Sequence, residues 1–107
     1  MSLKIYNKLV RDKIPAIISA NGGQPRSREL SEAEYLPALI EKLGEEYEEF
    51  KQDQNIEELA DLQEVLLALY RVLSIAPADV ERARVQKAER RGTFSKQIYL
   101  ETVQEDE

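Results

Sequence analysis

Apolar residues recur at helical spacing in two long stretches of the chain. After Ser31 and up to about Lys51, they fall three or four positions apart and form one stripe, Leu36, Leu39, Ile40, Leu43, Tyr47 and Phe50. A second stripe, between Ile56 and about Ile75, consists of Leu59, Leu62, Leu66, Leu69 and Leu73. This spacing predicts two amphipathic helices, each with one buried face. The run over residues 65–69 is apolar nearly all round, which predicts that the second helix is the buried central one.

Local signals predict where these two helices begin and how they meet. Ser31 and Glu34 have the spacing of a capping box, in which each side chain accepts a hydrogen bond from the other residue's backbone N–H. A polar turn, residues 51–55, separates the two apolar stripes. Helices joined by so short a turn pack antiparallel. The sequence therefore predicts an antiparallel central helix hairpin.

Two shorter helices are expected on either side of the hairpin. Asp12 is suited to cap a helix over residues 13–20, which ends at an Asn-Gly-Gly run. A fourth helix is expected from Pro77 to Arg91, because proline favours the first turn of a helix and a glycine follows Arg91. Residues 4–10 and 93–100 are expected to be extended.

The whole chain, residues 1–107, is expected to form one all-α domain with four helices. Its length allows a single domain with a modest core, which association with further copies would enlarge. Residues 101–107 carry four acidic side chains and are expected to be a frayed tail. No stretch reaches the ~18 apolar residues of a membrane helix, so no membrane partner is expected. The absence of cysteine is compatible with a cytoplasmic protein.

Composition and charge restrict the chemistry. The chain has no Cys and no His, which excludes thiolate and imidazole metal ligands and a Ser-His-Asp triad. The net charge is −6, and it is unevenly distributed. Residues 29–64 carry thirteen acidic and two basic side chains, whereas residues 1–28 and 65–100 have net charges of +5 and +4. An acidic centre between basic flanks favours a divalent cation with a phosphorylated small molecule over nucleic acid.

Four carboxylates take matched positions on the two helices of the hairpin. On a helical wheel, Glu46 and Glu49 lie beside the apolar stripe of the first helix, and Glu58 and Asp61 lie beside that of the second. In an antiparallel pair, Glu46 faces Asp61 and Glu49 faces Glu58. Four such carboxylates on one half-buried patch repel one another unless some are protonated or a hard cation binds them. This pattern favours a Mg²⁺ site, since Mg²⁺ accepts carboxylate oxygens and bridges to phosphate.

The same acidic residues allow simpler interpretations. Acidic side chains on a helix often form a solvated face that binds nothing. Glu58 also has the position to complete a helix cap with Asn55.

Basic residues give a second candidate site, for phosphate. Lysine and arginine next to a helix start, or spaced along one helix face, can hold phosphate oxygens. The residues in such positions are Lys8, Arg11, Lys87 and Arg91. The alternative is that they pair with the acidic helices. No P-loop or GxGxxG motif for nucleotide binding is present.

Three parts of the chain resemble a known family. Residues 42–49 and 57–61, KLGEEYEE and EELAD, resemble the EExxE…ExxD signature of the all-α nucleoside triphosphate pyrophosphohydrolases, the superfamily of MazG and phosphoribosyl-ATP pyrophosphohydrolase. Residues 6–15, YNKLVRDKIP, resemble the opening of a MazG-like subgroup. Residues 91–94, RGTF, resemble that subgroup's closing Arg-Gly-Gly-Phe, with Thr93 in place of the second glycine. The resemblance spans nearly the whole chain.

The resemblance implies both a fold and a chemistry. It implies a four-helix, MazG-like architecture and Mg²⁺-dependent cleavage between the α and β phosphates of a nucleotide, which releases pyrophosphate and a nucleoside monophosphate. The family's metal ligands fall on Glu46, Glu49, Glu58 and Asp61, with Glu45 as the other glutamate of the signature. Members also tend to form homodimers or dimers of dimers.

Together these observations predict a nucleotide pyrophosphohydrolase. Mg²⁺, or Mn²⁺ in its place, would polarise the α-phosphate, and Glu45 or Glu49 would orient or deprotonate the attacking water. The basic residues would neutralise the leaving pyrophosphate. The expected substrate is a nucleoside triphosphate or a related phosphoribosyl nucleotide. A non-catalytic helical module, which binds nucleotide or metal or only mediates oligomerisation, is the alternative.

Overall fold

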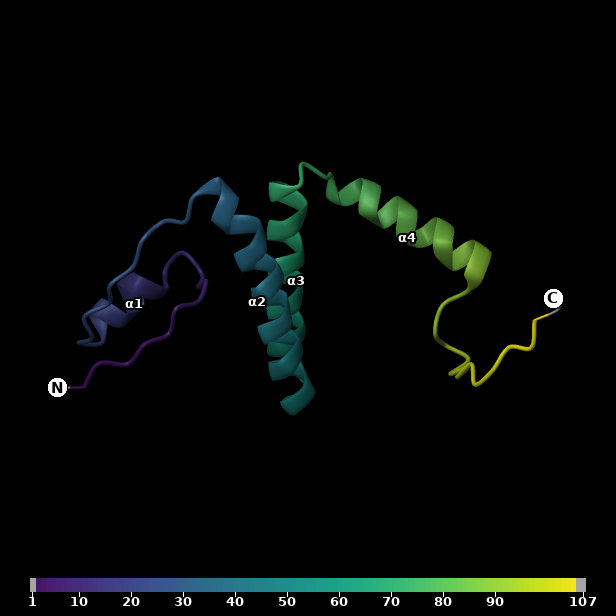
Figure 1. Ribbon diagram of the computed structural model, residues 1–107, viewed down its shortest axis with the longest axis horizontal. Helices are drawn as coiled ribbons and strands as arrows, with labels where there is room; N and C mark the ends of the chain where they lie inside the picture. The colour runs from purple at the N-terminus through teal and green to yellow at the C-terminus, as the bar shows by residue number, and fades with distance from the viewer. Residues whose placement is uncertain (1, 106–107) are drawn as a thin grey trace. The chain divides into compact units, whose positions relative to one another are not determined.

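The computed structural model describes residues 2–105 and is built from helices (Figure 1). They are α1 (Ile14–Ala20), α2 (Glu32–Gln52), α3 (Ile56–Val72) and α4 (Pro77–Arg91). No strand occurs in this part of the chain, so the predicted all-α class is confirmed. The third helix ends at Val72, earlier than the predicted end near Ile75.

The chain divides into two units, one up to Ser74 and one from Ile75 onward. The first contains α1, α2 and α3, and the second contains α4. Of the helices described, none combines the length and the apolar character needed to cross a membrane.

Helices α2 and α3 lie side by side in the first unit (Figure 1). The predicted capping box begins α2: the backbone N–H of Glu34 donates to Ser31 Oγ at 3.3 Å, and the backbone N–H of Ser31 donates to Glu34 Oε1 at 3.0 Å. Asn55 caps α3, where its side-chain oxygen accepts from the Glu58 backbone N–H at 2.9 Å. These caps satisfy N–H groups that have no partner within the helix.

The core between α2 and α3 is small. Its buried apolar side chains are Leu39 and Val65, which are 3% and 8% exposed. The prediction that α3 is the buried central helix is wrong for the structure described, because Val65 is its buried residue, while Leu59 is 53% exposed and Leu66 is 37% exposed. Ile40, from the α2 stripe, is also exposed. One neighbouring helix covers only part of each apolar stripe, since a stripe is at least about 100° wide.

Sequence signals outside α2 and α3 predicted the structure less accurately. Lys13, not Asp12, is the residue before α1, and no side chain caps that helix. Residues 4–10 form no strand, and Asn7 has a φ of 45°. Residues 93–100 contain a turn in which the Gln97 N–H donates to the Phe94 carbonyl at 3.1 Å. The conformation of these segments depends on short polar side chains and local turns. They have no apolar periodicity from which it could be predicted.

The second unit contains helix α4, which is followed by a glycine C-cap. Helix α4 begins at Pro77 and ends at Arg91, and Gly92 follows as its C-cap with a φ of 84° and a ψ of −177°, a conformation that suits glycine. Thr93 is not among the residues with positive φ, so its backbone has none of the strain that a glycine at this position would relieve. Arg84 is hydrogen-bonded to Glu81 along the same helix.

Replacing Glu34 with Gln is expected to lower the melting temperature at neutral pH but not in acid. The Arg28 guanidinium, and after it the backbone and hydroxyl of Ser31, lower the pKa of Glu34 from 4.5 to about 2. A carboxylate with a lowered pKa stabilises the fold above its ordinary pKa, and this contribution is lost as the pH falls toward the lowered value. The Tm difference between wild type and E34Q, measured by thermal unfolding at several pH values, should therefore shrink between 4.5 and about 2.

The matched control is Glu32→Gln. Glu32 lies in the same first turn of α2 and shares its position near the helix start. Since Arg28 bonds to Glu34, E32Q should not reproduce the same acid-dependent difference. A Tm difference for E34Q that is constant with pH would contradict the role given to the Arg28–Glu34 pair.

Candidate metal centre

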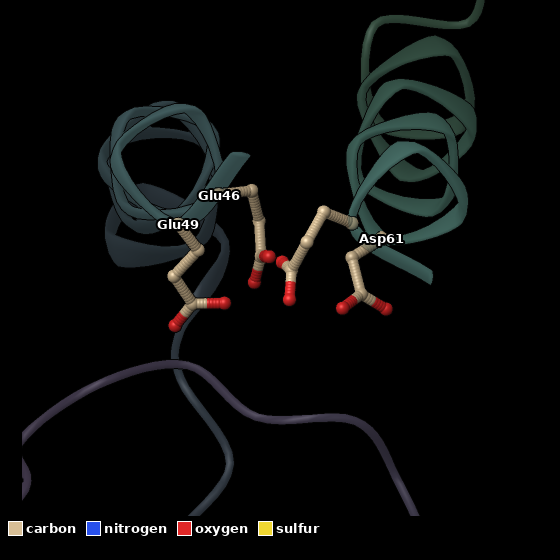
Figure 2. A group of neighbouring side chains, drawn as sticks. Glu46, Glu49 and Asp61 are labelled. Atoms are coloured by element: carbon tan, nitrogen blue, oxygen red, sulfur yellow. The ribbon is translucent and has the colours of Figure 1, made fainter. Parts of the chain in front are cut away.

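Four carboxylates converge where α2 and α3 pack together. Glu46 and Glu49 project from α2, and Glu58 and Asp61 project from α3. One oxygen from each lies within 4.8 Å of the corresponding oxygens of the other three. In Figure 2 the labelled side chains, Glu46 and Glu49 on one helix and Asp61 on the other, extend to the same side of the helix pair. The grouping is the one that the helical wheel predicted, because residues three apart share a helix face.

Burial is greatest at Glu46. It is 5% exposed, comparable to the two apolar core residues, whereas Glu58 and Asp61 are half-buried and Glu49 is exposed. The Oε2 atoms of Glu46 and Glu58 are buried and have no hydrogen-bond partner. A buried polar atom without a partner is costly and uncommon in folded proteins. These two oxygens are therefore the observation that points to a bound cation.

The electrostatics of the cluster agree with this interpretation. Burial raises the pKa of Glu46, and the charges of Glu49 and Asp61 raise it further, while Lys42 acts in the opposite direction. Burial, and then the carboxylates of Glu49 and Asp61, raise the pKa of Glu58. A raised pKa means that the ionised form is disfavoured in its surroundings. A cation among these oxygens would remove that penalty.

Two basic side chains, Lys42 and Arg11, contact carboxylates of the cluster. Lys42 Nζ lies 3.3 Å from Glu46 Oε1. Arg11 Nη2 donates to Asp61 Oδ1 at 2.6 Å, although the two residues are fifty positions apart in sequence. The four carboxylates and these two side chains together carry a formal charge of −2. One divalent cation would neutralise it.

The donor set fits a hard divalent ion. Four carboxylates supply only oxygen, which Mg²⁺, Mn²⁺ and Ca²⁺ prefer, and the chain has no sulfur or imidazole ligand for zinc. The alternative role of Glu58 as a helix cap uses only its backbone: Asn55 accepts from the Glu58 N–H, and the Glu58 carboxylate is left free. The Glu58 side chain is therefore available to a metal ion.

The structure does not bring every predicted residue to this group. Glu45 lies outside the four and pairs with Lys42 at 3.4 Å. Lys8 lies over the ring of Tyr6, with its Nζ 5.7 Å from the ring centre. Lys87 and Arg91 belong to the second unit, so their phosphate-binding role stays a prediction.

A pocket of about 390 Å³ adjoins the carboxylates. Glu46 and Asp61 form part of its wall, and Arg11 and Lys42 lie beside them. Its apolar wall is formed by Leu9, Val10, Leu39, Val65 and Ala68. A ligand bound by the cluster would therefore find an apolar surface directly next to it.

Several residues of this pocket were not predicted from the sequence. Tyr35 and Lys42 lie on α2, and Glu64 and Arg71 lie on α3. Lys42 precedes Glu46 by about one turn, and Arg71 follows Glu64 by about two turns, so each lies on the same helix face as a carboxylate of the pocket. That spacing was the signal that could have identified them.

The metal-free protein is expected to become more stable when Glu58 is replaced with Gln, and to lose its stabilisation by metal. Wild-type Tm should rise with millimolar Mg²⁺ or Mn²⁺, because a ligand bound only by the folded state stabilises it by about 2.7 kcal/mol at about a hundredfold excess over Kd. E58Q removes one of the repelling charges and one oxygen ligand. Its Tm should be higher than wild type without metal and should rise little with metal, as measured by differential scanning fluorimetry.

Glu57→Gln is the control for this experiment. Glu57 is exposed, lies in the same first turn of α3 and is outside the cluster. E57Q should keep the metal response of the wild type. A full metal response in E58Q would remove Glu58 from the set of ligands.

Comparison with known proteins adds one relative. No protein-family model matches the chain, and no solved structure matches it. An uncharacterized protein of Mycolicibacterium smegmatis is 50% identical over 44 residues, which are 41% of this chain. The matched stretch covers 45% of that protein's length, so the chain spans less than half of the relative that it matches.

Proposed function

We propose that this protein is a Mg²⁺-dependent pyrophosphohydrolase that converts a nucleoside triphosphate, or a related phosphoribosyl nucleotide, to the monophosphate and pyrophosphate. The observation that carries the proposal is the buried, unpartnered Oε2 of Glu46 within a cluster of four carboxylates. The neighbouring pocket offers room for the organic part of a substrate. The resemblance to the MazG-like family supports the same reaction, with α2 and α3 as that family's antiparallel hairpin.

In this proposal the carboxylates have two roles, metal binding and activation of a water molecule. Glu46, Glu58 and Asp61 would hold Mg²⁺, or Mn²⁺, together with Glu49. The bound ion would supply Lewis-acid activation of the phosphate and lower the pKa of a water molecule. Glu49 is the exposed member of the four, so it is best placed to orient or deprotonate a water that enters from solvent. Glu45, held by Lys42, is the second candidate for this base.

Charge neutralisation would come from the basic residues. Arg11 lies at the cluster and lines the pocket, so it is the strongest candidate for binding substrate phosphate. Lys42 is also within reach of both the cluster and the pocket. Lys8, Lys87 and Arg91 complete the proposed set.

Association into a homodimer or a dimer of dimers belongs to the same proposal. Ile40, Tyr47 and Leu59 are each more than half exposed, although they lie on the apolar stripes of the hairpin. Burying such side chains against another copy would stabilise the association by about 25 cal/mol for each Å² of apolar surface removed from water. We further propose that the enzyme works in the cytoplasm, where nucleoside triphosphates are present.

Pyrophosphate release from a panel of nucleotides, with and without Mg²⁺, tests the proposed activity. Turnover should require the metal ion. Glu46→Gln should lower kcat/KM by about a hundredfold or more, because the loss of metal activation costs several kcal/mol and each ~1.4 kcal/mol is tenfold in rate. Glu48→Gln is the matched control, since Glu48 is exposed and lies outside the cluster, and it should retain activity.

A non-catalytic module is the competing proposal. It has the same cluster and pocket, and it would bind metal or nucleotide without turnover. Tight Mg²⁺-dependent nucleotide binding with no pyrophosphate release from any nucleotide would favour the module and overturn the enzyme.

Lys87→Ala tests the phosphate role of the second unit. If Lys87 binds the leaving pyrophosphate, its loss should lower kcat/KM by at least about tenfold, which is ~1.4 kcal/mol of transition-state stabilisation. The Mg²⁺-dependent Tm shift without nucleotide should persist. Arg84→Ala, whose side chain is already bonded to Glu81, should have a smaller effect. Wild-type activity in both K87A and R91A would contradict this role and move the proposed phosphate site to Lys8, Arg11 and Lys13.

A further inference from the structure

One side chain ties the N-terminal segment to the helices that carry the carboxylates. Among the hydrogen bonds and ion pairs of residues 2–105, only those of Arg11 join the segment before α1 to α2 or α3. Residues 9–12 of that segment form one wall of the 390 Å³ pocket. The wall is therefore held to the rest of the pocket, as far as polar contacts are concerned, by Arg11 alone.

The geometry of this contact leaves part of each partner free. Arg11 Nη2 bonds to Asp61 Oδ1 at 2.6 Å, and its Nη1 is 3.8 Å from Glu64 Oε1, too far for a hydrogen bond. Asp61 thus has its second oxygen available, and a carboxylate offers about four lone-pair positions in total. A metal ion and Arg11 can therefore share Asp61 without competing for the same position.

We infer that Arg11, besides its proposed contact with substrate phosphate, positions Asp61 and thereby couples metal binding to the pocket wall. It holds one oxygen of Asp61, which orients the carboxylate toward the cluster. Through the same contact it fixes residues 9–12 against α3. The inference rests on the metal site of the proposed function and adds that the metal site and the pocket wall are ordered together.

Two physical arguments support the coupling. Groups that hydrogen-bond a metal ligand from outside fix its orientation, and their loss typically weakens metal binding by about 10- to 100-fold. Coupling between two binding events is also reciprocal. If Arg11 helps Asp61 to bind metal, bound metal must strengthen the Arg11 contact and thereby order residues 9–12.

Metal affinity and hydrogen–deuterium exchange test this inference on the full chain, with Mn²⁺ as the probe. In the wild type, Mn²⁺ should slow deuterium uptake in the peptide that covers residues 9–12. Arg11→Met keeps an unbranched apolar stem and removes every donor. It should weaken Mn²⁺ binding by about tenfold, and Mn²⁺ should no longer slow exchange over residues 9–12.

Two further variants separate positioning from a general loss of charge or stability. Arg11→Lys can still give one donor to Asp61, so it should restore most of the Mn²⁺ affinity. Arg28→Met breaks the Arg28–Glu34 ion pair, which lies outside the pocket, and should leave Mn²⁺ affinity and exchange over residues 9–12 as in the wild type.

Changes in Mn²⁺ affinity or deuterium exchange in the opposite direction would overturn the inference. Tighter Mn²⁺ binding in R11M, or faster exchange over residues 9–12 when Mn²⁺ is added to the wild type, would mean that Arg11 competes with the metal. Unchanged Mn²⁺ affinity in R11M would reduce Arg11 to a structural contact. The proposed function can fail separately from this inference. If the wild type binds Mn²⁺ but hydrolyses no nucleotide, the proposed activity is overturned and the coupling still stands. If the wild type binds no Mn²⁺, both the metal site and this inference are overturned.

Discussion

The packing of α2 against α3 forces four carboxylates into one place, and their mutual repulsion is the constraint around which the first unit is arranged. Glu46 is nearly as buried as Leu39 and more buried than Val65, so a charged group occupies part of the small core. Lys42 and Arg11 reach the cluster from two directions and offset part of its charge. Each of these contacts offsets negative charge that the packing of α2 against α3 brings together.

This arrangement is unfavourable unless a cation is bound. A carboxylate that is desolvated and surrounded by like charges either takes up a proton or requires a counter-ion. Lys42 and Arg11 supply only part of that charge, and the buried Oε2 atoms of Glu46 and Glu58 remain without partners. Since so little apolar surface is buried between α2 and α3, a metal ion at this place would act both as a site for chemistry and as a substitute for core. Stability and function would then depend on the same ion.

Sequence periodicity predicted the part of this centre that lies on helices. The spacing of Glu46 with Glu49, and of Glu58 with Asp61, depends only on the helical repeat and on the capping residues that begin α2 and α3. The Arg11–Asp61 bond was not predictable in this way, because residue 11 lies in an irregular segment with no repeat that relates it to α3. The exposure of Leu59 and Leu66 was also missed, since a helical wheel identifies an apolar face and says nothing of what covers it.

The central claim, that the four carboxylates hold a divalent cation, is tested most directly by locating the ion. Crystals of the protein grown with Mn²⁺ can be measured at a wavelength where manganese scatters anomalously. The claim predicts one anomalous peak between α2 and α3, about 2.0–2.3 Å from oxygens of Glu46, Glu58 and Asp61, the range for a small divalent ion on carboxylates. The absence of a peak there at millimolar Mn²⁺, with Glu46 Oε2 instead hydrogen-bonded to another part of the protein, would contradict it.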